Sequence, residues 1–227
     1  MMPHEGQRVA TAGAPLDNCR AAMIMVHGRG AAPENILELA PHFGRRDVAY
    51  IAPAASGGTW YPKGFMSPIA DNEPGISSGI AVIDALVHDL LAHGLPSERL
   101  IVLGFSQGGC LASTYAVRHP RRFGGVIVYS GGLIGPPGTM WLTDPAGPTE
   151  RHAGHGDPSA LHATPVFLGC SDVDGHIPRT RVDESAGVFR ALGADVTERI
   201  YPGMGHLVNE DEIAFTRDLL AKVVASH

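Results

Sequence analysis

The amino-acid sequence predicts an α/β protein built on a mostly parallel central sheet that helices cover on both faces. Short apolar runs rich in Val, Ile, Leu and Ala alternate along the chain with longer segments of helical period. The runs are apolar at nearly every position, as is typical of parallel strands buried on both faces. With 227 residues, of which 44% are hydrophobic, the chain is long enough for one substantial core and short for two. We therefore expect a single domain.

The expected strands are the six apolar runs bounded by polar residues or turn signals. They cover residues 22–26, 48–52, 100–104, 125–129, 165–168 and 196–201. Residues 1–15 are expected to form a loose arm ahead of the domain at 16–227, and this arm could add an edge strand.

The expected helices carry apolar residues at steps of three and four. The clearest period runs through Ile76, Ile80, Ile83, Val87 and Leu90. Proline, glycine and charged residues mark the ends of the helices. Together the helices cover residues 33–43, 76–93, 109–119, 179–192 and a last segment that begins at 210.

Composition and charge argue against several classes of protein. The net charge of −6 gives no reason to expect a nucleic-acid partner. No apolar run has the length of a membrane span, and the first six residues lack the basic and apolar blocks of a secretory signal. Cys19, Cys110 and Cys170 are odd in number and scattered, which favours a reducing compartment over a disulfide framework. We expect a cytoplasmic protein and leave a homodimer open.

The pentapeptide Gly104-Phe105-Ser106-Gln107-Gly108 lies where an expected strand turns into an expected helix. Gly-x-Ser-x-Gly in that setting is the nucleophile elbow, whose glycines make room for a strained turn that lifts the serine hydroxyl above the sheet. A serine hydroxyl needs a base to take its proton at neutral pH. The partners of an elbow serine follow it in the order acid, then histidine.

An acid and a histidine follow the last two expected strands in that order. Asp172 and Asp174 come directly after the fifth expected strand, and His206 comes directly after the sixth. Because the carboxyl ends of parallel strands share one rim of the sheet, these side chains are expected to meet Ser106. His206 is the predicted general base. One aspartate is predicted to accept its Nδ1–H, and the other to bind loop amides.

Acyl transfer also needs N–H donors for the developing oxyanion, and two are predicted. One is the amide of Gln107, and the other is the main-chain amide of Arg29 in the glycine-rich loop at 27–30. The alternative for that loop is an ordinary strand-to-helix turn. The Arg29 side chain either braces a loop or attracts an acidic substrate.

Two long connections rich in Gly and Pro, at about 54–74 and 130–164, follow the carboxyl ends of strands and are expected to be functional. Each holds one of the two tryptophans, with other large apolar side chains beside it. We expect them to form an apolar pocket for small to medium acyl groups; the alternative is a cover over the core. The predicted pocket residues are Trp60, Tyr61, Phe65, Met66, Leu133 and Trp141, with Ile134 and Met140 nearby.

The other nucleophilic and metal-binding side chains are expected to be structural. His152, His155 and His162 are close in sequence, but no cysteine or clearly placed carboxylate completes a tetrahedral set, so no metal site is predicted. Cys110 is expected to be a small buried hydrophobe, and Cys170 a packing residue near the acid loop.

Four motifs together resemble the phospholipase/carboxylesterase family of α/β-hydrolases, which includes acyl-protein thioesterases and bacterial carboxylesterases. They lie at 27–30, 104–109, 174–178 and 203–206, and the resemblance runs from about residue 23 to the C-terminus. The family's Asp-x-x-(Val/Ile)-Pro pattern falls on Asp174, so the resemblance implies this aspartate as the acid. It also implies the α/β-hydrolase fold and ester or thioester hydrolysis by a Ser-His-Asp triad without a cofactor. Gly175 stands where proline is common, and 145–162 looks unusually long and His-rich, so substrate range is not carried over.

The predicted activity is hydrolysis of carboxylic esters or thioesters of small to medium apolar acyl groups through an acyl-enzyme. Alternatives that use the same triad are a lactone or dienelactone hydrolase, an acyltransferase and a perhydrolase. A non-catalytic binding module is a further alternative, although such proteins usually lose a triad member and here all three are present.

Overall fold

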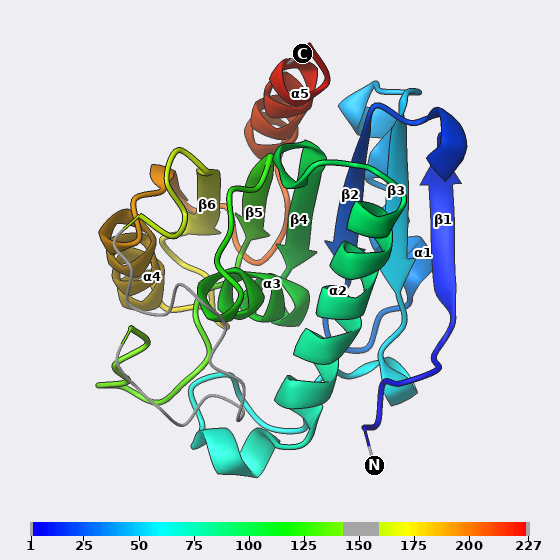
Figure 1. Ribbon diagram of the computed structural model, residues 1–227. Helices are drawn as coiled ribbons and strands as arrows, with labels where there is room; N and C mark the ends of the chain where they lie inside the picture. The colour runs from blue at the N-terminus through cyan, green and yellow to red at the C-terminus, as the bar shows by residue number, and fades with distance from the viewer. Residues whose placement is uncertain (1, 143–158, 226–227) are drawn as a thin grey trace.

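The computed structural model describes residues 2–142 and 159–225, and its centre is a seven-stranded sheet (Figure 1). The strand order is β1-β3-β2-β4-β5-β6-β7, with β1 antiparallel to β3 and every other neighbouring pair parallel. All six predicted strands are confirmed, although β6 is longer than expected. The strands are β1 (Val9–Gly13), β2 (Ala21–Val26), β3 (Val48–Pro53), β4 (Leu100–Phe105), β5 (Gly125–Tyr129), β6 (Pro165–Ser171) and β7 (Asp195–Tyr201).

The helices are α1 (Pro33–Leu37), α2 (Gly75–Ala92), α3 (Gln107–Arg118), α4 (Arg179–Ala191) and α5 (Glu210–Ala225). The single helix expected over 33–43 is wrong, because α1 ends at Leu37 and a separate 3-10 turn covers Ala40–Phe43. Pro41 explains the break. It has no amide hydrogen to continue the helical ladder, and its ring would collide with the carbonyl of Leu37.

The N-terminal arm contributes an edge strand and is also held at its tip. β1 pairs with β3 in the register Val9↔Pro53. Ahead of it, His4 is buried, and its backbone N–H donates a hydrogen bond to Ser78 Oγ at 2.9 Å. The His4 ring nitrogen Nε2 lies 2.8 Å from Trp60 O. The arm therefore packs beside the first long connection.

Alternate residues along each strand enter two separate cores, one on each face of the sheet. On β2, Ala22, Ile24 and Val26 pack with α2, α3 and α4, while Met23 and Met25 pack with α1 and α5. Figure 1 shows α2 and α3 in front of the sheet and α1 behind it. The predicted architecture, with helices on both faces, is thus confirmed. It leaves the carboxyl ends of β2, β4, β6 and β7 at one rim.

Within the described residues, α2 is the one helix whose length and composition would suffice to cross a membrane. In the fold its apolar stripe is buried against the sheet and α3. This is the packing expected of a core helix with residues at steps of three and four.

Candidate active site

Ser106 occupies a strained turn between β4 and α3. Its φ of 56° and ψ of −122° lie outside the regions that L-residues ordinarily adopt. Two glycines make this turn sterically possible. A Cβ on Gly104 would come within 2.2 Å of Gly108 O, and one on Gly108 within 2.1 Å of Val26 O. The predicted elbow is thus present in the backbone, and it presents a half-buried serine hydroxyl at the rim.

The structure brings the predicted serine, histidine and acid together in one chain of hydrogen bonds. His206 Nε2 lies 2.9 Å from Ser106 Oγ, and His206 Nδ1 lies 2.8 Å from Asp174 Oδ2. The imidazole is 21% exposed and also packs against the ring of Phe105, with 5.0 Å between ring centroids. With Nδ1–H donating to the carboxylate, Nε2 has its lone pair directed at the hydroxyl, which is the arrangement a general base requires.

Asp174 is held in its ionised form by its hydrogen bonds. Its side chain is fully buried, and its second oxygen accepts the amide hydrogens of His176 at 2.8 Å and Ile177 at 3.0 Å. Burial alone would raise the pKa of this carboxyl, but the bonds from His206 and from the two amides outweigh it, so the pKa lies below its ordinary value. A carboxylate is therefore available to orient the imidazole.

Asp172 does not reach the imidazole and instead joins two loops. Its Oδ1 accepts the amide hydrogen of Gly203 at 2.8 Å, and the side chain lies in an exposed part of the loop. Ser171 Oγ makes a parallel link by accepting the amide hydrogen of Gly205 at 3.0 Å. Both bonds tie the end of β6 to the segment that carries His206. This is the loop-amide role that the sequence left open for one of the two aspartates.

The segment that carries His206 is anchored at its far end by a capping box on α5. Asn209 Oδ1 accepts the amide hydrogen of Glu212, and Glu212 Oε2 accepts that of Asn209, each at 2.9 Å. Glu212 is completely buried, and its Oε1 has no hydrogen-bond partner among the described residues. Burial, with a smaller contribution from the nearby Asp211 charge, raises the pKa of Glu212 from its ordinary 4.5 to about 7.

We therefore expect Glu212 to make the protein less stable as the pH rises from about 4.5 to about 7. A raised pKa in the folded state means that folding favours the protonated acid. The contribution of Glu212 to the free energy of unfolding is therefore complete below pH 4.5 and is lost as the pH rises to about 7. The shift corresponds to about 3 kcal/mol. Glu212→Gln keeps the cap and should remove this dependence. Urea unfolding at several pH values measures this dependence, and substitution of the exposed Glu210 by glutamine is the control. If the free energy of unfolding changed with pH equally in Glu212→Gln and in the wild type, the expectation would be contradicted.

The loop at 27–30 lies directly beside the serine. A Cβ on Gly28 would lie 3.4 Å from Ser106 Cβ, and both Arg29 and Gln107 line the same cavity as Ser106. The Gln107 amide is the first of α3 and so has no acceptor within the helix. The two residues predicted to supply main-chain donors therefore line the same cavity as Ser106.

The side chains of the two predicted oxyanion residues brace the first long connection. The Arg29 guanidinium donates to the carbonyl oxygens of Tyr61, Pro62 and Lys63 at 2.6–3.1 Å. The Gln107 side chain accepts the Trp60 amide hydrogen at 2.9 Å and donates to Tyr61 O at 2.8 Å. Of the two roles open to the Arg29 side chain, the structure therefore supports bracing over attraction of an acidic substrate.

A cavity of about 560 Å³ opens at Ser106, and its wall is largely apolar. Two of the predicted pocket residues, Tyr61 and Phe65, line it. The rest of the described lining consists of His27, Gly28, Arg29, Ala31, Asn35, Ile36, Gly64, Phe105, Ser106, Gln107, Cys110, His176, Ile177 and His206.

The other predicted pocket residues are not part of the described lining. Trp60 is fully buried, and its Nε1 donates to His27 O at 2.9 Å, so it supports the loop beside the serine from below. Leu133 is buried in the core, Met66 packs against the core, and Trp141 donates from Nε1 to Ile134 O at 2.8 Å. Large apolar side chains in rim connections thus divide between lining the cavity and covering the core.

Several lining residues were not singled out from the sequence. Ile36 comes from α1, and Phe105 and Ile177 flank the serine and the acid in the chain. His176 packs edge-on against His206, with 4.7 Å between ring centroids. Phe105, His176 and Ile177 lie close to Ser106 or Asp174 in the sequence, and this proximity could have indicated them. Nothing in the sequence indicated Ile36 on α1.

The cysteines are buried or partly buried thiols. Burial raises the pKa of Cys110 to about 11 and that of Cys170 to about 12. Cys110 nevertheless lines the cavity, and the Cys170 thiol lies 3.6 Å from Asp174 Oδ2. His152 and His155 fall outside the described residues. Within residues 2–142 and 159–225, no group of three His, Cys, Asp or Glu side chains is placed to hold a metal ion.

Comparison with known proteins identifies relatives along nearly the whole chain. A family model described as phospholipase/carboxylesterase matches residues 8–224. A solved phospholipase/carboxylesterase from Dyadobacter fermentans is 32% identical, with a TM-score of 0.84 over 97% of this chain and 99% of that one. The solved esterase PE8, 21% identical with a TM-score of 0.74 over 96% of this chain and 99% of that one, has the same fold.

Two curated relatives match a shorter part of the chain. A probable carboxylesterase of Oryza sativa subsp. japonica is 26% identical over 63% of this chain, and acyl-protein thioesterase 1 of Gibberella zeae is 28% identical over 64%. The matches cover 48% and 59% of those two proteins, so the chain aligns with less than two thirds of the length of each.

Proposed function

This chain belongs to the phospholipase/carboxylesterase family of carboxylic ester hydrolases, and we propose that it hydrolyses esters or thioesters of small to medium apolar acyl groups with Ser106 as nucleophile. The observation that carries the proposal is the unbroken hydrogen-bonded chain from Asp174 through His206 to Ser106 at the wall of an apolar cavity. Neither the fold nor the family by itself assigns roles to these residues.

In the proposed reaction, His206 Nε2 takes the proton of Ser106 as Oγ attacks the acyl carbonyl carbon. The amides of Arg29 and Gln107 donate to the oxyanion of the tetrahedral intermediate. Asp174 stabilises the imidazolium, which then gives its proton to the leaving alkoxide or thiolate. Water attacks the acyl-enzyme with His206 again as base, and Ser106 leaves with the proton.

The cavity supports a neutral, apolar acyl group over an acidic one. Its described lining contains one arginine, and the Arg29 guanidinium is already engaged by three carbonyl oxygens. The carbon surfaces of Phe65, Phe105 and Ile177 offer apolar contact instead. The cavity volume of about 560 Å³ suits a small ligand.

A panel of nitrophenyl esters and matched thioesters, from acetate to octanoate, tests the proposed substrate class. We expect saturable hydrolysis of the neutral esters and a kcat/KM at least about tenfold lower for an ester whose acyl chain ends in a carboxylate, because no free cation faces it in the described lining. Equal rates for the carboxylate-terminated ester would contradict the assignment of an apolar pocket. Analysis of the products formed with an added alcohol or peroxide, and with a lactone as substrate, distinguishes ester hydrolysis from acyl transfer, perhydrolysis and lactone hydrolysis.

A cytoplasmic location remains our prediction, as do the absence of a nucleic-acid partner and the alternative of a homodimer. The three cysteines are unpaired in the structure, which is consistent with a reducing compartment.

A further inference from the structure

Arg181, on the first turn of α4, is a buried charge outside the predicted triad and outside the lining of the cavity. From its contacts we propose that Arg181 is a positioning residue, which sets the acyl-chain preference by holding Phe65, a residue of the cavity lining, against the segment 133–141. This inference rests on the proposed function, because it concerns the substrate range of the same cavity.

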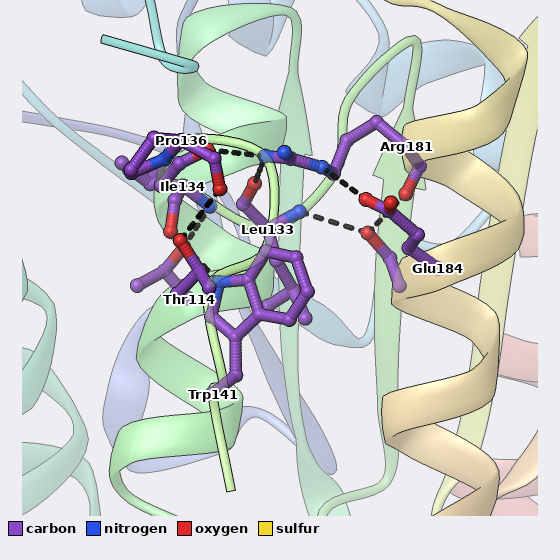
Figure 2. A network of polar contacts seen from close by, with 10 residues as sticks. Thr114, Leu133, Ile134, Pro136, Trp141, Arg181 and Glu184 are labelled. Carbon is purple, nitrogen blue, oxygen red and sulfur yellow. Dashed lines mark hydrogen bonds and ion pairs between the residues drawn. The ribbon is translucent and has the colours of Figure 1, made fainter. Parts of the chain in front are cut away.

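The guanidinium of Arg181 holds the start of the second long connection. Its Nη1 donates to Leu133 O at 2.7 Å and to Gly135 O at 2.8 Å, while Nε donates to Glu184 Oε2 at 2.8 Å. The side chain is 1% exposed, whereas that of Glu184 is 46% exposed, so one end of the ion pair is in solvent. Figure 2 shows the guanidinium directed from α4 toward this segment.

The same guanidinium contacts an aromatic ring from each of the two long connections. Its carbon lies 5.6 Å from the ring centroid of Phe65 and 5.0 Å from that of Trp141, both within the range of cation–π attraction. Phe65 also lines the cavity, and Gly135 N donates to Phe65 O at 2.9 Å. Arg181 on α4 therefore contacts a ring of the cavity lining, although it does not line the cavity itself.

The rest of the segment is fixed to the helices behind it. Leu133 N donates to Ser185 Oγ on α4 at 2.9 Å, and Ile134 N donates to Thr114 Oγ1 on α3 at 3.0 Å. These bonds and the one from Trp141 to Ile134 are drawn in Figure 2. Because the segment is anchored at consecutive residues, Arg181 has a rigid frame against which to hold Phe65.

The guanidinium makes these contacts through Nη1, Nε and its planar carbon, while Nη2 has no hydrogen-bond partner among the described residues. A lysine ammonium carries the same charge and can donate to carbonyl oxygens, but it lacks the delocalised planar group that Arg181 places 5.6 Å from the Phe65 ring centroid and 5.0 Å from that of Trp141. Arg181→Lys therefore keeps the buried charge while removing the geometry, and it separates the two contributions. The exposed Arg190 on the same helix, which pairs with Glu198 at 3.0 Å, offers Arg190→Lys as the matched control.

The test compares kcat and KM for nitrophenyl acetate and octanoate. In Arg181→Lys we expect the octanoate-to-acetate ratio of kcat/KM to fall about fivefold or more through a higher KM for octanoate, since a displaced Phe65 ring contacts only the longer chain. Acetate turnover should stay within about twofold of wild type. Phe65→Ala should shift the ratio in the same direction, and Arg181→Lys added to Phe65→Ala should change it little further.

An unchanged ratio in Arg181→Lys, or a further fall in the double variant equal to that in the single one, would overturn the proposal. Loss of stability alone lowers the amount of active enzyme for both esters alike and leaves the ratio in place. Wild-type hydrolysis of acetate reports separately on the proposed function. If Arg181→Lys does not fold, Phe65→Leu and Trp141→Leu, which remove the two rings that the guanidinium contacts, should each lower the octanoate-to-acetate ratio, and an unchanged ratio in both would overturn the proposal.

Discussion

Replacement of Ser106 by alanine should lower kcat/KM for ester hydrolysis by at least about 10⁴-fold. The reason is that Ser106 Oγ is the atom to which His206 Nε2 is directed, at 2.9 Å, and no other hydroxyl in the described residues contacts that imidazole. Without it, no acyl-enzyme can form. Steady-state hydrolysis of nitrophenyl acetate by the purified variant measures the loss.

Ser113→Ala is the matched control for this substitution. Ser113 is a fully buried serine of the same strand–helix unit, and its Oγ donates to Cys110 O at 2.9 Å. Its removal should leave kcat/KM within about threefold of wild type, because that bond lies within α3. Comparable activity of Ser106→Ala and Ser113→Ala, with circular dichroism spectra like that of wild type, would remove Ser106 from the mechanism.

Asp174→Asn should lower kcat by about 10³–10⁴-fold with little change in KM. The asparagine fits the same space, but its side chain cannot stabilise an imidazolium, and its NH₂ group favours the wrong tautomer of His206. It also loses the charge that the amides of His176 and Ile177 support. Initial-rate kinetics over a range of ester concentrations separate kcat from KM.

Asp172→Asn distinguishes the neighbouring aspartate. Asp172 accepts one amide hydrogen, from Gly203, which an asparagine oxygen can also accept. Its kcat should therefore fall less than about tenfold. The reverse order of effects, with Asp172→Asn the more damaging, would assign the acid role to Asp172.

The convergence of the three site residues was predictable because each lies at the carboxyl end of a strand or in the loop that follows it. In a parallel sheet the carboxyl ends of strands meet at one rim, so positions 106, 172–174 and 206 had to be neighbours once the strands were recognised. The choice between Asp172 and Asp174 was not available from strand order. The two aspartates are two positions apart in one loop, so the choice depends on the path of that loop. Before the hydrogen bonds were known, only the family resemblance distinguished them.

The pocket was less predictable because apolar composition does not say which way a side chain points. Trp60 and Phe65 come from the same connection, yet Trp60 supports His27 from within the core and Phe65 lines the cavity. The helix over 33–43 failed for a local reason, the proline at 41. Arg181 gave no signal at all, since a charged residue near the start of a helix is ordinarily read as solvent-exposed.

The central claim is that Ser106 is a nucleophile activated by His206. Incubation with a fluorophosphonate, followed by intact-mass and peptide mass spectrometry, tests it most directly. The account predicts one adduct per chain, located on Ser106, and greatly slowed labelling in His206→Ala. Folded protein that stays unlabelled, or an adduct on any residue other than Ser106, would contradict it.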